Sequence, residues 1–182
     1  MHGREKHLLI EDIYTKYSLL FKNYKIEDFF LFGVIRNPLD WVVSWYNFNS
    51  RLEIKDTNHR MHRHYAGEMT FAEFWDSNKN RSIVSRGQTP MFFSSKNNNI
   101  KVNYLAKLET LIEDLSRIKG ILGIDSLDIP KVNTSIVRVV SDNVSESIKK
   151  EITTKYSRDY ELINNLESFN SEGLELFKNR TL

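Results

Sequence analysis

The sequence of 182 residues contains no cysteine, which excludes disulfide bonds, thiolate metal sites, iron–sulfur clusters and a cysteine nucleophile. It has no apolar run near the roughly 20 residues that a membrane-spanning helix requires. Residues 1–7 lack the apolar stretch of a secretory signal peptide. We therefore expect a soluble, cytoplasmic protein with no segment that crosses a membrane.

The sequence also has little net charge, because 26 Lys and Arg residues face 24 Asp and Glu residues, a formal charge of +2. So small an excess, with acidic residues interspersed, argues against nucleic acid as a partner. Large apolar side chains are plentiful, with 11 Phe, 8 Tyr and 3 Trp. Repeats and low-complexity tracts are absent, and the composition indicates one globular domain over residues 1–182.

One segment has the pattern of a strand, a tight turn and a helix. Residues 29–35 form a short, continuous run of aromatic and branched side chains, which predicts a strand buried on both faces. Arg36-Asn37-Pro38 follows at once, and Pro38 suits the first turn of a helix. In α/β proteins, ligands gather at such turns, outside the carboxyl end of a strand.

Further elements follow from apolar spacing and from helix caps. Thr70 and Glu73 have the spacing of a capping box, and Ser145 is placed to cap a longer helix. We expect helices over 8–24, 109–122 and 145–160, a strand over 100–105, an extended segment over 124–141, a loop or surface helix over 51–67, an irregular segment over 77–99, and a weakly patterned tail from Asn164.

The turn at residue 36 could hold a phosphate group. A phosphate there would meet the Arg36 guanidinium, which binds two oxygens at once, together with backbone N–H groups at the positive end of a helix dipole. Ser44, two helical turns further on, would add a hydroxyl donor. The alternative is structural: Arg36 pairs with Asp40 to cap the helix, and Ser44 faces solvent.

The segment from Phe32 to Tyr46 resembles the nucleotide 3′-phosphate motif of the sulfotransferases, in which an Arg ends a strand and a Ser follows eight residues later. Its Arg-Asn-Pro sequence is similar to that of the carbohydrate, membrane-type sulfotransferases and their bacterial relatives. Trp41 stands where that family often has a second Arg. The resemblance implies an α/β, P-loop-NTPase-like domain with a parallel central sheet flanked by helices. Other segments resemble the family in the same order: Lys6-His7, 86–89, 103–109, 129–135 and 156–160.

That family also carries a loop of the type Lys-Thr-Gly-x-Thr, which holds the 5′-phosphosulfate, between its first strand and first helix. No such loop sequence precedes Arg36. We therefore expect that the N-terminal strand–loop–helix is missing. The chain would then be either a truncated sulfotransferase or a natural short form that binds nucleotide or anionic glycan without turnover. Loss of a central strand would expose sheet edges and apolar surface, so we also expect self-association.

The resemblance implies transfer of a sulfuryl group from 3′-phosphoadenosine 5′-phosphosulfate to a hydroxyl group of a carbohydrate. Arg36 and Ser44 would bind this co-substrate. His7 matches the family's Lys-His position and would accept the hydroxyl proton; its alternative is a surface residue at the start of a helix. Arg86 and Gln88 lie in a segment that resembles the family's substrate region.

Three histidines, His59, His62 and His64, lie within a basic stretch. No carboxylate stands at a spacing that would complete a first shell, so we expect no metal. His62 is interpreted as a contact for an anionic acceptor, the alternative being a solvated polar loop. The aromatic residues Trp75 and 92–93 either stack on a sugar ring or lie in the core.

Overall fold

The computed structural model describes residues 23–24, 28–93, 102–126 and 139–179. His7, nearly all of the expected helix over 8–24 and most of the extended segment over 124–141 lie outside these described residues. The chain divides into two compact units. The sheet unit comprises the described parts of residues 1–35, 88–118 and 158–182, and the helical unit those of 36–87 and 119–157. The expectation of a single domain stays a prediction.

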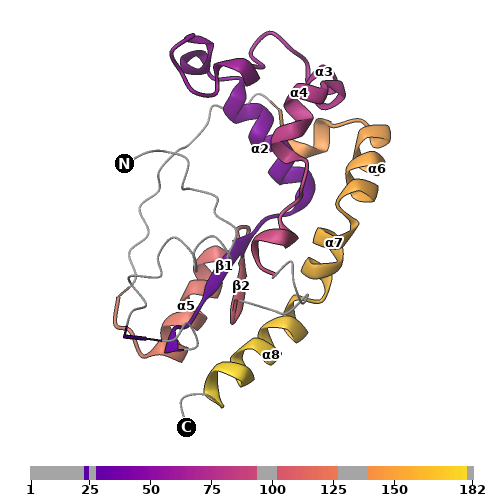
Figure 1. The fold of residues 1–182 in the computed structure, drawn as a ribbon. Helices are drawn as coiled ribbons and strands as arrows, with labels where there is room; N and C mark the ends of the chain where they lie inside the picture. Colours follow the sequence, from indigo (N-terminus) through magenta and orange to yellow (C-terminus); the bar gives the residue numbers. More distant parts are fainter. Residues whose placement is uncertain (1–22, 25–27, 94–101, 127–138, 180–182) are drawn as a thin grey trace. The chain divides into compact units, whose positions relative to one another are not determined.

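The sheet unit is built on two parallel strands, β1 (Phe32–Ile35) and β2 (Tyr104–Lys107), which lie side by side in Figure 1. In their register, Phe32 lies opposite Tyr104 and Ile35 opposite Lys107. The structure thus confirms a helix-rich α/β arrangement with a small parallel sheet. Both strands are shorter than expected, and β2 extends two residues beyond the expected end at Leu105.

Helices pack on both faces of this pair, but on one face they leave β1 partly exposed. On one face lies α5 (Leu111–Leu122), which ends at Gly123 with φ +63°, as expected for a glycine that terminates a helix. On the other face lie α7 (Ser157–Asn164), α8 (Leu166–Lys178) and the 3₁₀ helix η5 (Thr89–Met91). The α5 side buries Tyr104, Ala106, Leu115 and Ile118, and the opposite side buries Ile35, Phe92, Val102, Leu105, Leu162, Leu166 and Phe169.

Burial of β1 on both faces was a wrong expectation. Phe32 and Val34 share one face of the strand and are 46% and 40% exposed. The opposite face is tightly packed, because a Cβ added to Gly33 would lie 2.6 Å from Cε1 of Phe92. A continuous apolar run therefore does not imply two covered faces here.

The C-terminal elements also differ from expectation. Instead of one helix over 145–160, α6 (Glu146–Lys155) ends at Tyr156, whose backbone (φ −109°, ψ 30°) leaves the helical region, and α7 follows. The buried Tyr156 hydroxyl donates to the Val84 carbonyl at 2.6 Å. The tail from Asn164, whose sequence pattern is weak, forms α8, which buries Leu166, Phe169 and Gly173.

The helical unit packs short helices around an aromatic core. Its longest helix, α2 (Pro38–Asn49), is followed by the 3₁₀ helices η2 (Leu52–Lys55) and η3 (His62–His64). The expected capping box at Thr70 and Glu73 is confirmed and opens α3 (Phe71–Asp76). The unit also contains α4 (Asn78–Arg81), η4 (Ser82–Val84), η6 (Ser141–Asn143) and α6, and its core buries Val42, Val43, Tyr46, Ala66, Phe71, Phe74, Trp75, Val84, Val144, Ile152 and Tyr156.

None of the helices in the described part of the chain combines the length and the apolar character that crossing a membrane requires.

Candidate functional site

The turn after β1 is shaped by the cap of α2. The Asn37 side-chain oxygen accepts a hydrogen bond from the Leu39 N–H at 3.0 Å, and Pro38 occupies the start of the helix. Asn37 therefore forms the N-cap, and the Arg36–Asp40 pair of the sequence alternative stays a prediction. Arg36 is half-buried and immediately precedes the capping residue. Arg36 therefore stands in the chain next to the N-terminus of a three-turn helix, which is the positive end of its dipole.

Ser44 lies on α2, as expected, and is half-buried rather than fully open to solvent. Its hydroxyl donates to the Trp41 carbonyl one turn earlier, at 2.8 Å. A serine in a helix commonly makes this bond, and it leaves the oxygen's lone pairs available. To donate to a phosphate, the hydroxyl would rotate away from Trp41, a change that breaks one weak local hydrogen bond.

The helix α2, which follows Arg36 and carries Ser44, is firmly held within the helical unit. Asp40 in its first turn accepts a hydrogen bond from the Ser141 hydroxyl. Asn47 donates to the Val139 carbonyl at 2.8 Å and accepts from the Val139 N–H at 3.1 Å. Trp41, which stands in place of a second arginine, packs edge-on against Tyr156 at 5.7 Å between ring centroids. These contacts fix the orientation of α2 within its unit.

In the sheet unit, a buried carboxylate organises the segment that contains Gln88. Asp159, on α7 and 2% exposed, accepts hydrogen bonds from the N–H groups of Gln88 and Thr89, both at 2.8 Å, and from the Thr89 hydroxyl. Two segments that resemble the sulfotransferases, 86–89 and 156–160, therefore meet here. Gln88 is itself only 4% exposed, so its side chain presents little surface to an acceptor. Sequence reasoning singled out residues 156–160 but not this pairing.

Arg86, the other residue of that segment, is exposed in a turn of the helical unit. It precedes Gly87, which is buried with φ +69°, a backbone conformation that favours glycine. The glycine thus shapes the turn that presents the arginine to solvent.

The histidine cluster is partly buried. His62 is half-buried, and its Nδ1 has no hydrogen-bond partner among the described residues. His64 is 5% exposed and its Nε2 accepts from the Arg63 Nε at 2.9 Å. Burial, and then the charge of Arg63, lower the pKa of His64 below its ordinary value of 6.5. Within the described ranges no three His, Cys, Asp or Glu side chains form a cluster that could hold a metal ion.

The aromatic residues considered as sugar platforms lie in the cores of their units. Trp75 is 2% and Phe92 6% exposed. Phe93 packs edge-on against Phe169 at 5.7 Å between ring centroids. Their principal role is therefore packing, the second of the two sequence interpretations.

Comparison with known proteins gives one result. A family model described as "Sulfotransferase family" matches residues 4–177, which is nearly the whole chain. No curated protein and no solved structure gives a significant match.

Proposed function

This chain belongs to the sulfotransferase family, and we propose from this membership that it transfers a sulfuryl group from 3′-phosphoadenosine 5′-phosphosulfate to a hydroxyl group of a carbohydrate. The observation that carries the proposal is the family match over residues 4–177, which includes the strand, turn and helix around Arg36. The donor and the acceptor are our inference from the sequence resemblance.

In this reaction the acceptor oxygen forms a bond to sulfur while the bond from sulfur to the 5′-phosphate oxygen breaks. The hydroxyl proton passes to a base, and the products are the sulfate ester and adenosine 3′,5′-bisphosphate. We assign the base to His7, which lies outside the described residues. Histidine suits this role because an imidazole group ordinarily titrates close to neutral pH.

We assign Arg36 and Ser44 to the 3′-phosphate. The support is local: Arg36 adjoins the N-terminus of α2, and Ser44 lies two turns along that same helix. A charge-assisted hydrogen bond contributes about 1.5–3 kcal/mol, so loss of the guanidinium would weaken nucleotide binding about tenfold to a hundredfold. The fixed orientation of α2 would keep the cost of assembling this site small.

A second candidate function rests on residues 1–35 themselves, among which no 5′-phosphosulfate loop sequence of the Lys-Thr-Gly type occurs. In that alternative, the chain binds nucleotide or anionic glycan without turnover. The Lys and N–H groups of such a loop would otherwise stabilise the charge on the departing phosphate.

The test is transfer of radiolabelled sulfate from 3′-phosphoadenosine 5′-phosphosulfate to a panel of neutral and acidic saccharides. We expect labelled saccharide with the wild-type chain, strong loss with Arg36→Ala, and retention with Arg60→Ala, an exposed arginine of the same unit. Nucleotide binding without labelled product would select the non-catalytic alternative. Absence of both binding and transfer would refute both functions.

A further inference from the structure

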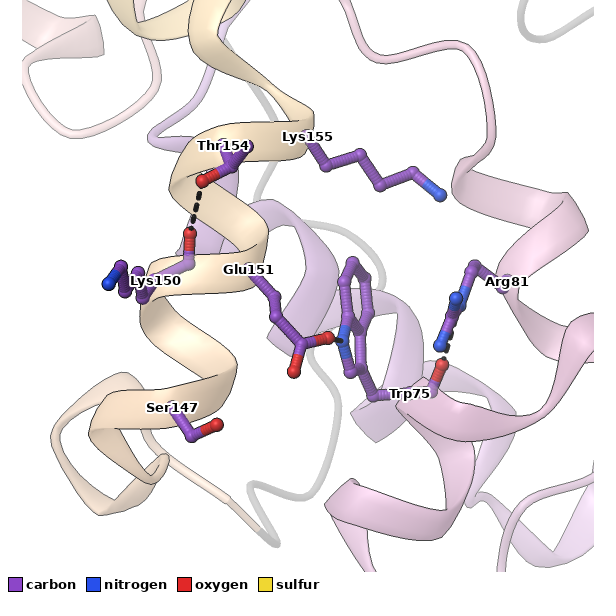
Figure 2. Close-up of a pocket in the computed structure, with 7 residues that line it drawn as sticks. All are labelled: Trp75, Arg81, Ser147, Lys150, Glu151, Thr154 and Lys155. Carbon is purple, nitrogen blue, oxygen red and sulfur yellow. Dashed lines mark hydrogen bonds between the residues drawn. The ribbon is translucent and has the colours of Figure 1, made fainter.

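The helical unit contains a pocket of about 450 Å³ that the sequence did not indicate (Figure 2). Neither Arg36 nor Ser44 is among the residues that line it. Its walls come from α6, the end of α3 and the end of α4. Trp75 forms part of the lining, and three of the other lining side chains, Arg81, Lys150 and Lys155, carry positive charge. A single carboxylate, Glu151, also lines the pocket.

Two of the cations are arranged around the same indole ring. The Arg81 guanidinium carbon lies 5.2 Å and the Lys155 ammonium nitrogen 5.5 Å from the ring centroid of Trp75. Arg81 is also fixed by a hydrogen bond from its Nε to the Trp75 carbonyl at 2.9 Å. Figure 2 shows the Lys155 side chain reaching from α6 towards the segment that carries Arg81. The positively charged groups of Arg81 and Lys155 therefore both lie close to the Trp75 ring.

The acidic side chains at this pocket offset these charges only in part, because the lining holds three cationic side chains, Arg81, Lys150 and Lys155, and the carboxylate of Glu151. Glu151 accepts the hydrogen bond of the Trp75 indole N–H at 2.9 Å, which engages one of its two oxygens. Asp76 lies 3.8 Å from Arg81, but its side chain is 77% exposed, so solvent screens the pair. Burial, and then the charge of Arg81, lower the pKa of Lys155, which reports the electrostatic cost of this arrangement.

We propose that this pocket binds a tetrahedral oxyanion, a sulfate or phosphate monoester carried by a small hydroxylated molecule such as a sugar. The oxyanion lies between Arg81 and Lys155, where it relieves their mutual repulsion and receives a directed guanidinium hydrogen bond. Trp75 is only 2% exposed, so its ring contacts the two cations and does not stack on the ligand. The second oxygen of Glu151 accepts from a ligand hydroxyl. This assignment does not depend on sulfuryl transfer, because it uses none of the residues proposed for the nucleotide.

The test is calorimetric titration of the full chain with glucose 6-sulfate, glucose 6-phosphate and glucose. We expect both esters, or one of them, to bind more tightly than glucose, and their ratio identifies the preferred oxyanion. Lys155→Met keeps an apolar stem over Trp75 and should weaken ester binding about threefold to tenfold. The matched control is Lys149→Met, because Lys149 lies on the same helix but pairs with Glu146 at 2.7 Å and does not line the pocket.

Equal affinity for both esters and glucose would overturn the proposal, as would equal weakening by Lys149→Met and Lys155→Met. The site is also expected to be separate from the nucleotide site. Arg36→Ala should therefore leave ester binding unchanged, and loss of ester binding in that variant would contradict the assignment to this pocket. Matching far-UV circular dichroism of all variants establishes that the comparison concerns folded chains.

Discussion

Substitution of Gly173 by alanine tests how α8 packs on the sheet unit. A Cβ at this position would lie 2.3 Å from the backbone carbonyl oxygen of Asn103. Backbone cannot rotate away as a flexible side chain can, so α8 must move by roughly 1 Å to reach ordinary contact. That movement strains the hydrogen bond from the Asn103 side chain to the Gly173 carbonyl, at 3.3 Å. It also strains two bonds between Asn170 and the Leu105 backbone, at 2.8 and 3.0 Å.

Three strained hydrogen bonds at about 1 kcal/mol each cost about 3 kcal/mol. The gain in helix propensity from glycine to alanine offsets about 1 kcal/mol. We therefore expect Gly173→Ala to lower the free energy of unfolding by about 2 kcal/mol, measured by urea titration followed by circular dichroism. The matched control is Gly120→Ala on α5, where the new methyl meets no atom within 4 Å. That variant should be stabilised by about 0.5–1 kcal/mol. Equal stabilisation by both substitutions would refute this account of α8.

Further predictions concern a buried carboxylate, a buried histidine and an exposed strand face. Asp159→Asn places an amide donor against N–H donors and should cost about 3 kcal/mol in urea unfolding, whereas the exposed Glu161→Gln on the same helix should change stability by less than about 0.5 kcal/mol. Because the pKa of His64 is lowered in the folded state, the unfolded chain binds more protons, and stability should fall as the pH drops below about 6.5; an equal urea midpoint at pH 7.5 and 5.5 would contradict this. Phe32 and Val34 should promote self-association, so a double substitution to serine and threonine should lower the mass measured by light scattering; a monomeric wild-type chain would be the opposing result.

Local signals in the sequence predicted local structure well. The helix that begins at Pro38 and the capping box at Thr70 occur where expected, and the strand before Arg36 occurs in a shorter form, because caps and short apolar patterns act within a few residues. The helix that ends before Gly123 was also predicted, because a glycine after the last turn is a local signal for the end of a helix.

Features that depend on distant contacts were not predictable in this way. Gly173 weakens the helical signal of the tail. The reason for a glycine at this position is the close approach of the Asn103 backbone, 70 residues earlier, which leaves no room for a side chain. Tyr156 ends α6 as its hydroxyl bonds the distant Val84 carbonyl. For the candidate site, the elements that carry Arg36 and Ser44 were predicted, whereas the cap by Asn37 and the serine's bond to Trp41 came from the structure.

The role of Arg36 is tested most directly by comparing two ligands that differ only in the 3′-phosphate. Adenosine 3′,5′-bisphosphate and adenosine 5′-monophosphate would be titrated into the wild-type chain, Arg36→Ala and the control Arg60→Ala. The account predicts that the wild type and the control prefer the bisphosphate by at least about tenfold, and that Arg36→Ala loses this preference. An undiminished preference in Arg36→Ala would contradict the assignment of this guanidinium to the nucleotide.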